Sequence, residues 1–479
     1  MIREDYEAVI GLEVHAQLQT KSKIFCSCSA EFGANPNENS CPVCLGHPGV
    51  LPVLNKTVVE YAVMMGIAVE CKINRTSILA RKNYFYPDLP KGYQISQYDK
   101  PICEHGIMRV LDANNEIKSI GITRIHIEED AGKSIHDQGT ETLIDVNRCG
   151  VPLIEIVSEP EISTAQEAYQ YLTGIKQIVQ YLEICDGNME EGSLRCDANV
   201  SVRKKGADKL GTKTEIKNLN SFRNVEKAIE FEINRQLDLI EDGHTIIQQT
   251  LLWNADTGVA HPMRTKEEAH DYRYFPDPDL LPIVISDEWF DAIKSQVVEL
   301  PKHKLERYIS EYGLPRYDAE VLTQTKQVAE YFDATCKLCT EFKQVSNWVM
   351  TEVLKVVNEQ KIPIDKFAVT PNYLSELILL IAKGTISGKI AKEVFQEIVV
   401  TGKSPEEVIK EKNLVQISDE GAIAQLISSV ILKFPEQKQQ FVAGEEKVLG
   451  FFVGQVMKES KGKANPALVN KLLKELLIK

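Results

Sequence analysis

The sequence predicts an α+β protein in which a sheet-rich part precedes a helical part. In residues 1–295, several stretches alternate aliphatic and polar side chains, the period of a strand with one buried face. From about residues 299–301 onward strand signals are almost absent, and helix-start signals such as Thr370-Pro371 and Asn465-Pro466 replace them. We therefore expect a sheet domain over residues 1–295, an all-α helical domain over 296–410 and a helical tail over 411–479.

The charge of the chain is uneven. The net charge is −14, which taken alone predicts repulsion of nucleic acid. Residues 411–479, however, carry 10 Lys and 8 acidic residues, a balance of +2, which leaves −16 for the other 410 residues. Most basic surfaces are only solvated, so phosphate binding by this tail is the minority interpretation on composition alone.

The sequence gives little indication of a membrane-spanning segment or of a signal peptide for export. The apolar run over residues 377–382 is too short to span a bilayer. The N-terminus lacks the basic-then-apolar layout of a signal peptide. We expect a cytoplasmic protein that does not contact membrane.

Four of the eleven cysteines are closely grouped. Cys26, Cys28, Cys41 and Cys44 follow the spacing C-x-C-x12-C-x2-C, and four thiolates at such spacing suit tetrahedral zinc. The alternative is four unrelated buried thiols. We predict a zinc knuckle over residues 26–44 that is structural, since a four-thiolate site leaves no coordination position for substrate.

Five stretches of the first 295 residues place polar side chains on one strand face and aliphatic side chains on the other. They lie within residues 9–15, 121–133, 151–160, 192–203 and 212–219. Their polar faces carry Glu13 and His15; Arg124, His126 and Glu128; Glu155; Arg195, Asp197 and Asn199; and Lys213, Glu215 and Lys217. Helices are expected near residues 58–69, after a cap at Ser163, and over 221–242 before Gly243.

If these strands pair into one sheet, their carboxylates converge on one surface that requires a cation. Oxygen ligands with one or two imidazoles suit Mg²⁺ or Mn²⁺. The sequence has neither a Walker A motif nor a dinucleotide-binding loop, so a nucleotide would be held by the sheet face and a metal. The alternative is an ordinary sheet with a solvated charged face. Strict alternation separates Glu128 from Glu129, so both serve one site only if the strand ends or bulges between them.

Residues 81–97 contain two prolines and four aromatic residues without a clean period, and we expect an irregular loop there. Lys82 and Lys91 could reach phosphates, while Tyr84 and Tyr86 could stack on a base or line a pocket. The alternative is a loop held in place by its own aromatic side chains. A second loop of this kind covers residues 270–276.

Taken together, these segments resemble a known family. GLEVH, RKNYFYPDLPKGYQISQ, ITRIHIEEDAGKS, PLIEIVSEP, EEGSLRCDANVS, TEIKNLNSF and DYRYFPDPDL are similar in sequence and order to the GatB family, the B subunits of glutamyl/aspartyl-tRNA amidotransferases of the GatCAB type. SGKIAKEVF, LVQISDE and FFVGQVMKESKGKANP resemble the YqeY-like tail of that family. The resemblance implies a glutamine-synthetase-like antiparallel-sheet cradle, a helical domain and a tail that holds tRNA.

The resemblance also implies an activity. ATP would phosphorylate the side-chain carboxylate of misacylated Glu-tRNA(Gln), Asp-tRNA(Asn) or both. Ammonia that the GatA amidase releases from glutamine would then displace the phosphate, and the small GatC protein would complete the complex. Glu13, His15, Glu128, Glu129, Glu155, Asp197 and Glu215 match the family's catalytic and metal positions. Lys82 and Lys91 match lysines of its cradle loop, and Arg195, Tyr84 and Tyr86 complete the expected ATP and substrate contacts.

Within that set, Mg²⁺ is assigned to His15, Glu13, Glu128, Glu129 and Glu155, and zinc to the four cysteines. Because members of the family vary at the cysteine cluster, zinc is expected to be a scaffold. Two rival hypotheses remain: a stand-alone carboxylate–amine ligase with a small-molecule acceptor, and a non-catalytic tRNA-binding scaffold.

Overall fold

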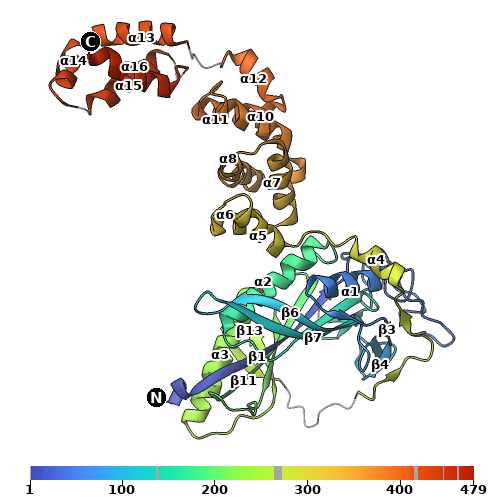
Figure 1. Cartoon of the computed structure of the whole chain (residues 1–479). Helices are drawn as coiled ribbons and strands as arrows, with labels where there is room; N and C mark the ends of the chain where they lie inside the picture. Colours follow the sequence, from blue (N-terminus) through green and yellow to red (C-terminus); the bar gives the residue numbers. More distant parts are fainter. Residues whose placement is uncertain are drawn as a thin grey trace. The chain divides into compact units, whose positions relative to one another are not determined.

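The computed structural model describes residues 2–135, 140–263, 272–414, 419–445, 447–460 and 463–478. The chain divides into two compact units, Met1–Leu300 and Pro301–Lys479 (Figure 1). The first unit contains the sheets and the second is helical, so the predicted α+β class is confirmed. Among the described residues, no helix is both long and apolar enough to cross a membrane.

A nine-stranded sheet organises the first unit. Its order is β14 (Val259–Pro262), β13 (Thr250–Asn254), β12 (Thr214–Leu219), β11 (Leu194–Lys204), β1 (Tyr6–Gln17), β10 (Pro152–Ser158), β7 (Ile117–Glu129), β6 (Cys103–Leu111) and β2 (Lys72–Ile73). All neighbours pair antiparallel except β12 and β13, which are parallel. The five strands expected from the sequence are five consecutive neighbours in this sheet, β12-β11-β1-β10-β7. Their pairing is the condition under which their carboxylates converge on one surface.

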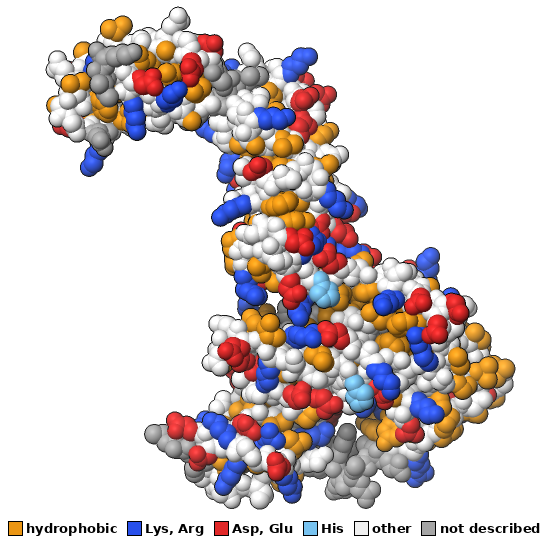
Figure 2. Space-filling model, in the orientation of Figure 1, with side chains coloured by type: hydrophobic (Ala, Val, Ile, Leu, Met, Phe, Trp, Pro, Cys, Tyr) orange, Lys and Arg blue, Asp and Glu red, His pale blue; other side chains and the backbone are white. Residues whose placement is uncertain are grey.

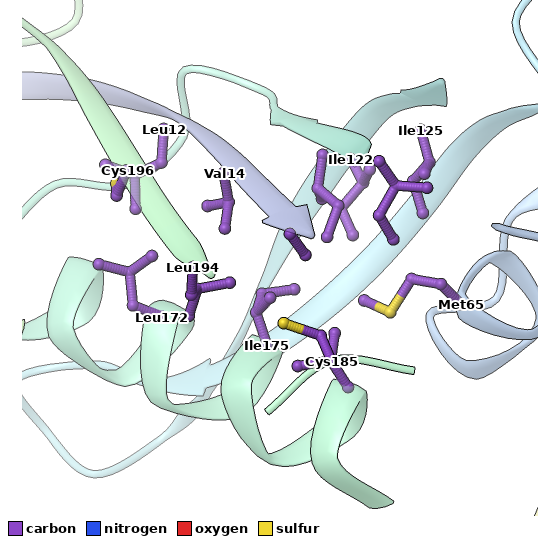
Figure 3. Close-up of a cluster of buried hydrophobic side chains, with 14 of the residues drawn as sticks. Leu12, Val14, Met65, Ile122, Ile125, Leu172, Ile175, Cys185, Leu194 and Cys196 are labelled. Carbon is purple, nitrogen blue, oxygen red and sulfur yellow. The ribbon is translucent and has the colours of Figure 1, made fainter. Parts of the chain in front are cut away.

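Helices cover the aliphatic face of this sheet. The helices of the first unit are η1 (Ile2–Asp5), α1 (Lys56–Ala68), α2 (Ala165–Tyr181), α3 (Phe222–Glu241) and α4 (Asp287–Lys294). Figure 3 shows Leu172 and Ile175 of α2 facing Val14 and Leu194 of the sheet, and all four are buried. Period-2 burial on the strands and an amphipathic stripe on α2 therefore leave the opposite, polar face of the sheet for chemistry.

Small sheets flank the large one: β15 (Phe275–Pro276) with β4 (Ala80–Asn83) and β5 (Tyr93–Ser96); β16 (Ile283–Val284) with β3 (Thr76–Ser77); and β8 (Lys133–Ile135) with β9 (Leu143–Asp145). The expectation of an irregular loop over residues 81–97 is wrong at both ends. Four residues of β4 pair with four of β5, and only the segment between them is a loop. In the second expected loop, residues 270–271 lie outside the described residues, and Phe275 and Pro276 form β15.

The second unit is built of helices. They are α5 (Pro301–Ser310), α6 (Arg316–Leu322), α7 (Lys326–Leu338), α8 (Phe342–Trp348), η2 (Val349–Val353), α9 (Leu354–Gln360), η3 (Ile364–Lys366), α10 (Pro371–Ala382), α11 (Gly388–Thr401), α12 (Pro405–Lys412), α13 (Glu420–Lys433), α14 (Pro435–Val442), α15 (Val448–Glu459) and α16 (Pro466–Ile478). Two separate apolar clusters lie in it. One extends from Tyr308 to Ile409 and the other from Ile423 to Leu477.

Candidate functional site

The register of the central strand β1 aligns the polar residues of its neighbours. His15 lies opposite Glu155 of β10 and Arg195 of β11, and Glu13 lies opposite Asp197 of β11. Because directly opposed residues of antiparallel strands project to the same face, the register gathers these side chains on one surface.

A first cluster forms around Glu155. Potential ligand atoms of His15, Glu128 and Glu155 all lie within 4.8 Å of one another. The Oε2 atom of Glu155 is 3.3 Å from Nε2 of His15 and 3.2 Å from Nε2 of His126, and Nε2 of His126 is 3.5 Å from Oε2 of Glu128. The cluster therefore holds two carboxylates and two imidazoles.

The charges of the first cluster stabilise one another. Burial lowers the pKa of His126, but the charge of Glu155 and hydrogen bonds to Glu128 and Glu155 outweigh burial and raise that pKa to about 9. The pKa of His15 is also raised, because contact with Glu155 outweighs the lowering effect of burial. Burial alone would raise the pKa of Glu155, yet the two histidines hold it well below the usual range.

A second cluster forms around Glu13 on the same face of the sheet. Carboxylate oxygens of Glu13, Asp197 and Glu215 lie within 4.8 Å of one another. Lys217 reaches this group, with Nζ 2.5 Å from Asp197 and 3.0 Å from Glu215. Asn199 donates a hydrogen bond of 3.0 Å to Glu13. Burial, followed by the charges of Glu155 and Asp197, raises the pKa of Glu13. The cluster holds three carboxylates and one lysine ammonium.

Glu129 does not join either cluster. β7 ends at this residue, and its carboxylate accepts a 2.8 Å hydrogen bond from the backbone N–H of Ile95 and a hydrogen bond from Nζ of Lys91. With Lys91, it lines a cavity of about 30 Å³ that also borders Lys23 and Cys44. Alternation therefore continues through the two acids: Glu128 faces the histidines, and Glu129 faces a lysine and the cysteine-rich segment.

The cationic and aromatic residues expected to contact ATP and substrate do not lie together in the structure. Nζ of Lys82 lies 5.2 Å from the ring centroid of Tyr272. Burial lowers the pKa of Lys82, but the charge of Glu128 outweighs it, so the ammonium is favoured beside the first cluster. Nη2 of Arg195 donates to Asp130 at 2.9 Å, and its charge lowers the pKa of His15 in the first cluster, against the raising effect of Glu155. Tyr86 is 66% exposed, whereas Tyr84 is half-buried and donates to Gln94.

The four grouped cysteines converge. Sγ of Cys44 lies 3.3 Å from Sγ of Cys26, 3.6 Å from that of Cys41 and 3.7 Å from that of Cys28. A hydrogen bond from Cys26 and the charge of Lys23, 3.6 Å away, lower the pKa of the Cys44 thiol to about 4. A set of four converging thiols with one already favoured as thiolate fits a tetrahedral metal ion.

Several residues that line the site were not among the predicted site residues. His126 stood on the same predicted strand face as Glu128, so its alternation was a usable signal. Gln94 and Ser96 both donate hydrogen bonds to Glu128, and Lys23 contacts Cys44. The alternation in the segment YQIS was obscured by the aromatic residues and prolines before it.

Comparisons with known proteins match both ends of this architecture. A family model described as the GatB/GatE catalytic domain matches residues 8–291, and one described as the GatB domain matches residues 330–477. A curated relative from Thermodesulfovibrio yellowstonii, named as the B subunit of an aspartyl/glutamyl-tRNA(Asn/Gln) amidotransferase, is 57% identical over 98% of this chain and 99% of its own length. Relatives of the same name from Thermoanaerobacter pseudethanolicus and Geotalea daltonii are 56% and 57% identical, and the alignments cover 99% and 98% of this chain and 100% and 98% of the relatives. The chain thus belongs to the GatB family.

Proposed function

We propose that this chain is the component of an aspartyl/glutamyl-tRNA(Asn/Gln) amidotransferase that activates the misacylated amino acid. It uses ATP to phosphorylate the side-chain carboxylate of Glu-tRNA(Gln), Asp-tRNA(Asn) or both, and ammonia then displaces the phosphate to give the amide. The observation that carries the proposal is the pair of carboxylate clusters, flanked by Lys82 and Lys217, on one sheet face of a GatB-family chain.

The residues fit the chemical demands of this reaction. A carboxylate is a poor acyl donor until one oxygen is phosphorylated, and phosphoryl transfer depends mainly on positioning and on compensation of negative charge. Lys82 supplies a fixed positive charge beside Glu128 and Glu155. Glu128, Glu155 and Asp197, expected to be catalytic, lie in the two clusters.

Both clusters fit a divalent cation. The first cluster would hold it with His15, Glu128 and Glu155, and the second with Glu13, Asp197 and Glu215. In the second group, three carboxylates face one lysine, Lys217. Bound Mg²⁺ would neutralise phosphate charge during transfer. His126 holds Glu155 and Glu128 together beside it.

Glu129 and Lys91 have a different task in this proposal. They lie on the other side of β7, in the narrow cavity beside the cysteines. Ammonia must arrive neutral and shielded from water, because water would hydrolyse the acyl phosphate. A buried carboxylate paired with a lysine fits the transfer of a proton from ammonium on that route.

The proposal includes partners and a place of action. The GatA amidase supplies ammonia, the small GatC protein completes the complex, and the tail over residues 411–479 holds the tRNA body. The substrates are those of translation, so we place the protein in the cytoplasm. Tail lysines are partly paired with acids, as in Lys433–Glu459 and Lys471–Glu420, and Figure 2 shows both signs mixed on the visible face of this segment. Recognition of tRNA by its shape and by a few lysine contacts fits this surface better than attraction by a strong positive electrostatic potential.

One assay separates this function from its rivals. The complex with GatA and GatC is incubated with Glu-tRNA(Gln), ATP, Mg²⁺ and glutamine, and formation of Gln-tRNA is measured. We expect activity that Glu128→Ala abolishes. Amide formation on a small acceptor without tRNA would instead indicate a stand-alone ligase, and wild-type rates in a Glu13→Ala, Asp197→Ala double variant would indicate a non-catalytic scaffold.

The cysteine cluster is proposed to hold structural zinc. Cys41→Ser and Cys44→Ser should each reduce bound zinc from about one equivalent to near zero, because four thiolates complete the coordination. Metal analysis of the purified complex measures this, with Cys71→Ser, outside the cluster, as the control. Unchanged zinc in both cluster variants would contradict the assignment.

A further inference from the structure

The β4–β5 hairpin lies against the end of β7 and contacts both of its terminal acids. Ser96 Oγ donates a 2.8 Å hydrogen bond to Oε2 of Glu128, and Gln94 Nε2 donates to Oε1 of the same carboxylate. The backbone N–H of Ile95, between them, donates to Glu129. Gln94 and Ser96 point to the same face of β5, toward Glu128, and the backbone between them reaches Glu129. One short strand therefore fixes two neighbouring carboxylates that point in opposite directions.

The amide of Gln94 has one acceptable orientation in this setting. Its Nε2 donates both to Glu128 and, at 2.6 Å, to the backbone carbonyl of Glu129. Its Oε1 accepts a 3.1 Å hydrogen bond from the hydroxyl of Tyr84. A flipped amide would place an oxygen against a carboxylate and a carbonyl, and would leave the tyrosine without its acceptor. The carboxylate and the carbonyl thus select the orientation in which Gln94 donates to Glu128, and the Tyr84 hydroxyl holds the other end of the amide by donating to it.

Neither residue is placed to contact a reacting group directly. Gln94 is 5% exposed and both ends of its amide are engaged within the protein. Burial raises the pKa of Tyr84, so its hydroxyl remains a neutral donor, and that hydroxyl is directed at Gln94. Its ring packs edge-on against Tyr86 and Tyr272, which holds the hydroxyl in place.

We infer that Tyr84, Gln94 and Ser96 are positioning residues that fix the carboxylate of Glu128 in the first cluster, and that Tyr84 acts through Gln94. For Tyr84, this role is inferred in place of base stacking or pocket lining, the two roles suggested by the sequence. It rests on the proposed function only in assigning the cluster to a divalent cation. A carboxylate held at both oxygens needs no reorganisation when a cation arrives, which favours cation binding and correct phosphate placement.

The test measures cation affinity directly. Mn²⁺ binding to the complex with GatA and GatC is followed by electron paramagnetic resonance, without ATP or tRNA. Tyr84→Phe removes one hydroxyl and keeps the ring, and Gln94→Met removes the amide at nearly constant volume. We expect each to weaken binding at one site by about tenfold or more, while the site built on Glu13 is unaffected and serves as an internal reference.

The double variant Tyr84→Phe, Gln94→Met tests whether Tyr84 acts through Gln94. If Tyr84 acts through Gln94, Tyr84→Phe adds nothing in the Gln94→Met background, because the acceptor of its hydroxyl is already absent. Tyr98→Phe, which also removes one hydroxyl near the hairpin from a ring 57% exposed and stacked on Tyr274, should bind Mn²⁺ as the wild type does. Thermal unfolding of each variant checks that the fold is retained.

The outcomes separate this inference from the proposed function. Unchanged Mn²⁺ affinity in Gln94→Met, independent additive effects of Tyr84→Phe and Gln94→Met, or no Mn²⁺ binding by the wild type would overturn the inference. Weakened Mn²⁺ binding in a complex that forms no Gln-tRNA would support the positioning network while refuting the transamidation. A fall in kcat at saturating Mn²⁺ without a change in KM for tRNA would further distinguish positioning of Glu128 from loss of substrate contact.

Discussion

Glu155 and Glu13 are acids of the same sheet face with opposite electrostatic surroundings. Two imidazoles hold the pKa of Glu155 well below its usual range, whereas burial and neighbouring acids raise that of Glu13. The first cluster is thus stabilised by its own ion pairs, and the second depends more on a cation from outside. The mid-strand positions of the acids in the sequence did not reveal this difference, because it depends on the contact that His126 of β7 makes with Glu155 of the neighbouring strand.

Glu376 on α10 offers a prediction outside the site. Its Oε1 is buried without a hydrogen-bond partner among the described residues, and burial followed by the charge of Glu406 raises its pKa. A raised folded-state pKa means that the folded protein binds this proton more tightly, so its contribution to stability is favourable at acid pH. That contribution is lost as pH rises from the unfolded value of 4.5 through the raised folded value.

Glu376→Gln should therefore raise the midpoint of thermal unfolding at pH 7 and have little effect near pH 4. Because the group is only partly buried, we expect a gain of less than about 1 kcal/mol. Calorimetry at the two pH values measures this, and Glu359→Gln, an exposed acid of α9, is the control. A loss of stability at pH 7 specific to Glu376→Gln would contradict the argument.

At the scale of elements, long periodic segments were predictable and short ones were not. β1, β7, β10 and β11 follow the alternation in the sequence, and α3 begins after Ser221 and ends before Gly243 as expected. The start of α2 is displaced by one residue: Thr164, not Ser163, is the N-cap, although Ser163 still donates its backbone N–H to Glu167. Boundaries shift in this way because adjacent hydroxyl residues compete for the same role.

The β4–β5 hairpin was missed because each strand has only four residues and pairing with distant partners stabilises it. β15, far away in the sequence, completes its sheet. Glu128 of β7 accepts hydrogen bonds from the side chains of Gln94 and Ser96, and Glu129 accepts one from a backbone N–H of β5. Such tertiary contacts override local pattern and have no signal within the segment itself. The positioning residues Gln94 and Ser96 were therefore beyond sequence reasoning, whereas His126 was within it.

The cysteine-rich segment contacts the hairpin loop at Gly46. This glycine has φ +65°, and a Cβ there would lie 2.5 Å from Cγ of Lys91. Gly46→Ala should combine the backbone cost of a positive φ, about 1–2 kcal/mol, with displacement of the Lys91 side chain. We expect a severalfold loss of glutamine-dependent transamidation with bound zinc retained.

Gly49 provides the matched control, because it has φ +85° and a Cβ added to it would meet no atom within 4 Å. Gly49→Ala should show the backbone cost in thermal unfolding and keep the transamidation rate. Equal rates for both variants would show that the contact between Gly46 and Lys91 has no role.

At the scale of the whole molecule, the sequence indicated where strand signals give way to helix signals. It did not indicate the residue after which the tail can be deleted without loss of contacts in the preceding helices. α12 continues to Lys412, Asn413 caps it in the left-handed conformation, and Leu414 packs on the apolar cluster that begins at Tyr308. The predicted boundary after residue 410 would remove these contacts. The cluster from Ile423 to Leu477 is separate, so a cut after Leu414 leaves the preceding helices intact.

Deletion after Leu414 should therefore raise the KM for tRNA by about tenfold or more, if the tail supplies a few phosphate contacts, and spare glutamine hydrolysis by GatA. Steady-state kinetics of the truncated complex measure both. A tRNA KM equal to that of the full chain would remove the proposed role of the tail, and loss of glutamine hydrolysis would show that the tail has another one.

The course of β1 through both clusters has one more consequence. This single strand supplies His15 to one cluster and Glu13 to the other, two residues apart, which fixes their backbone separation at about 7 Å. The strand thus holds the two groups of potential ligands at a fixed spacing along its length. A substrate that engages both must extend along the strand direction, as a chain of phosphates with an acceptor at one end would.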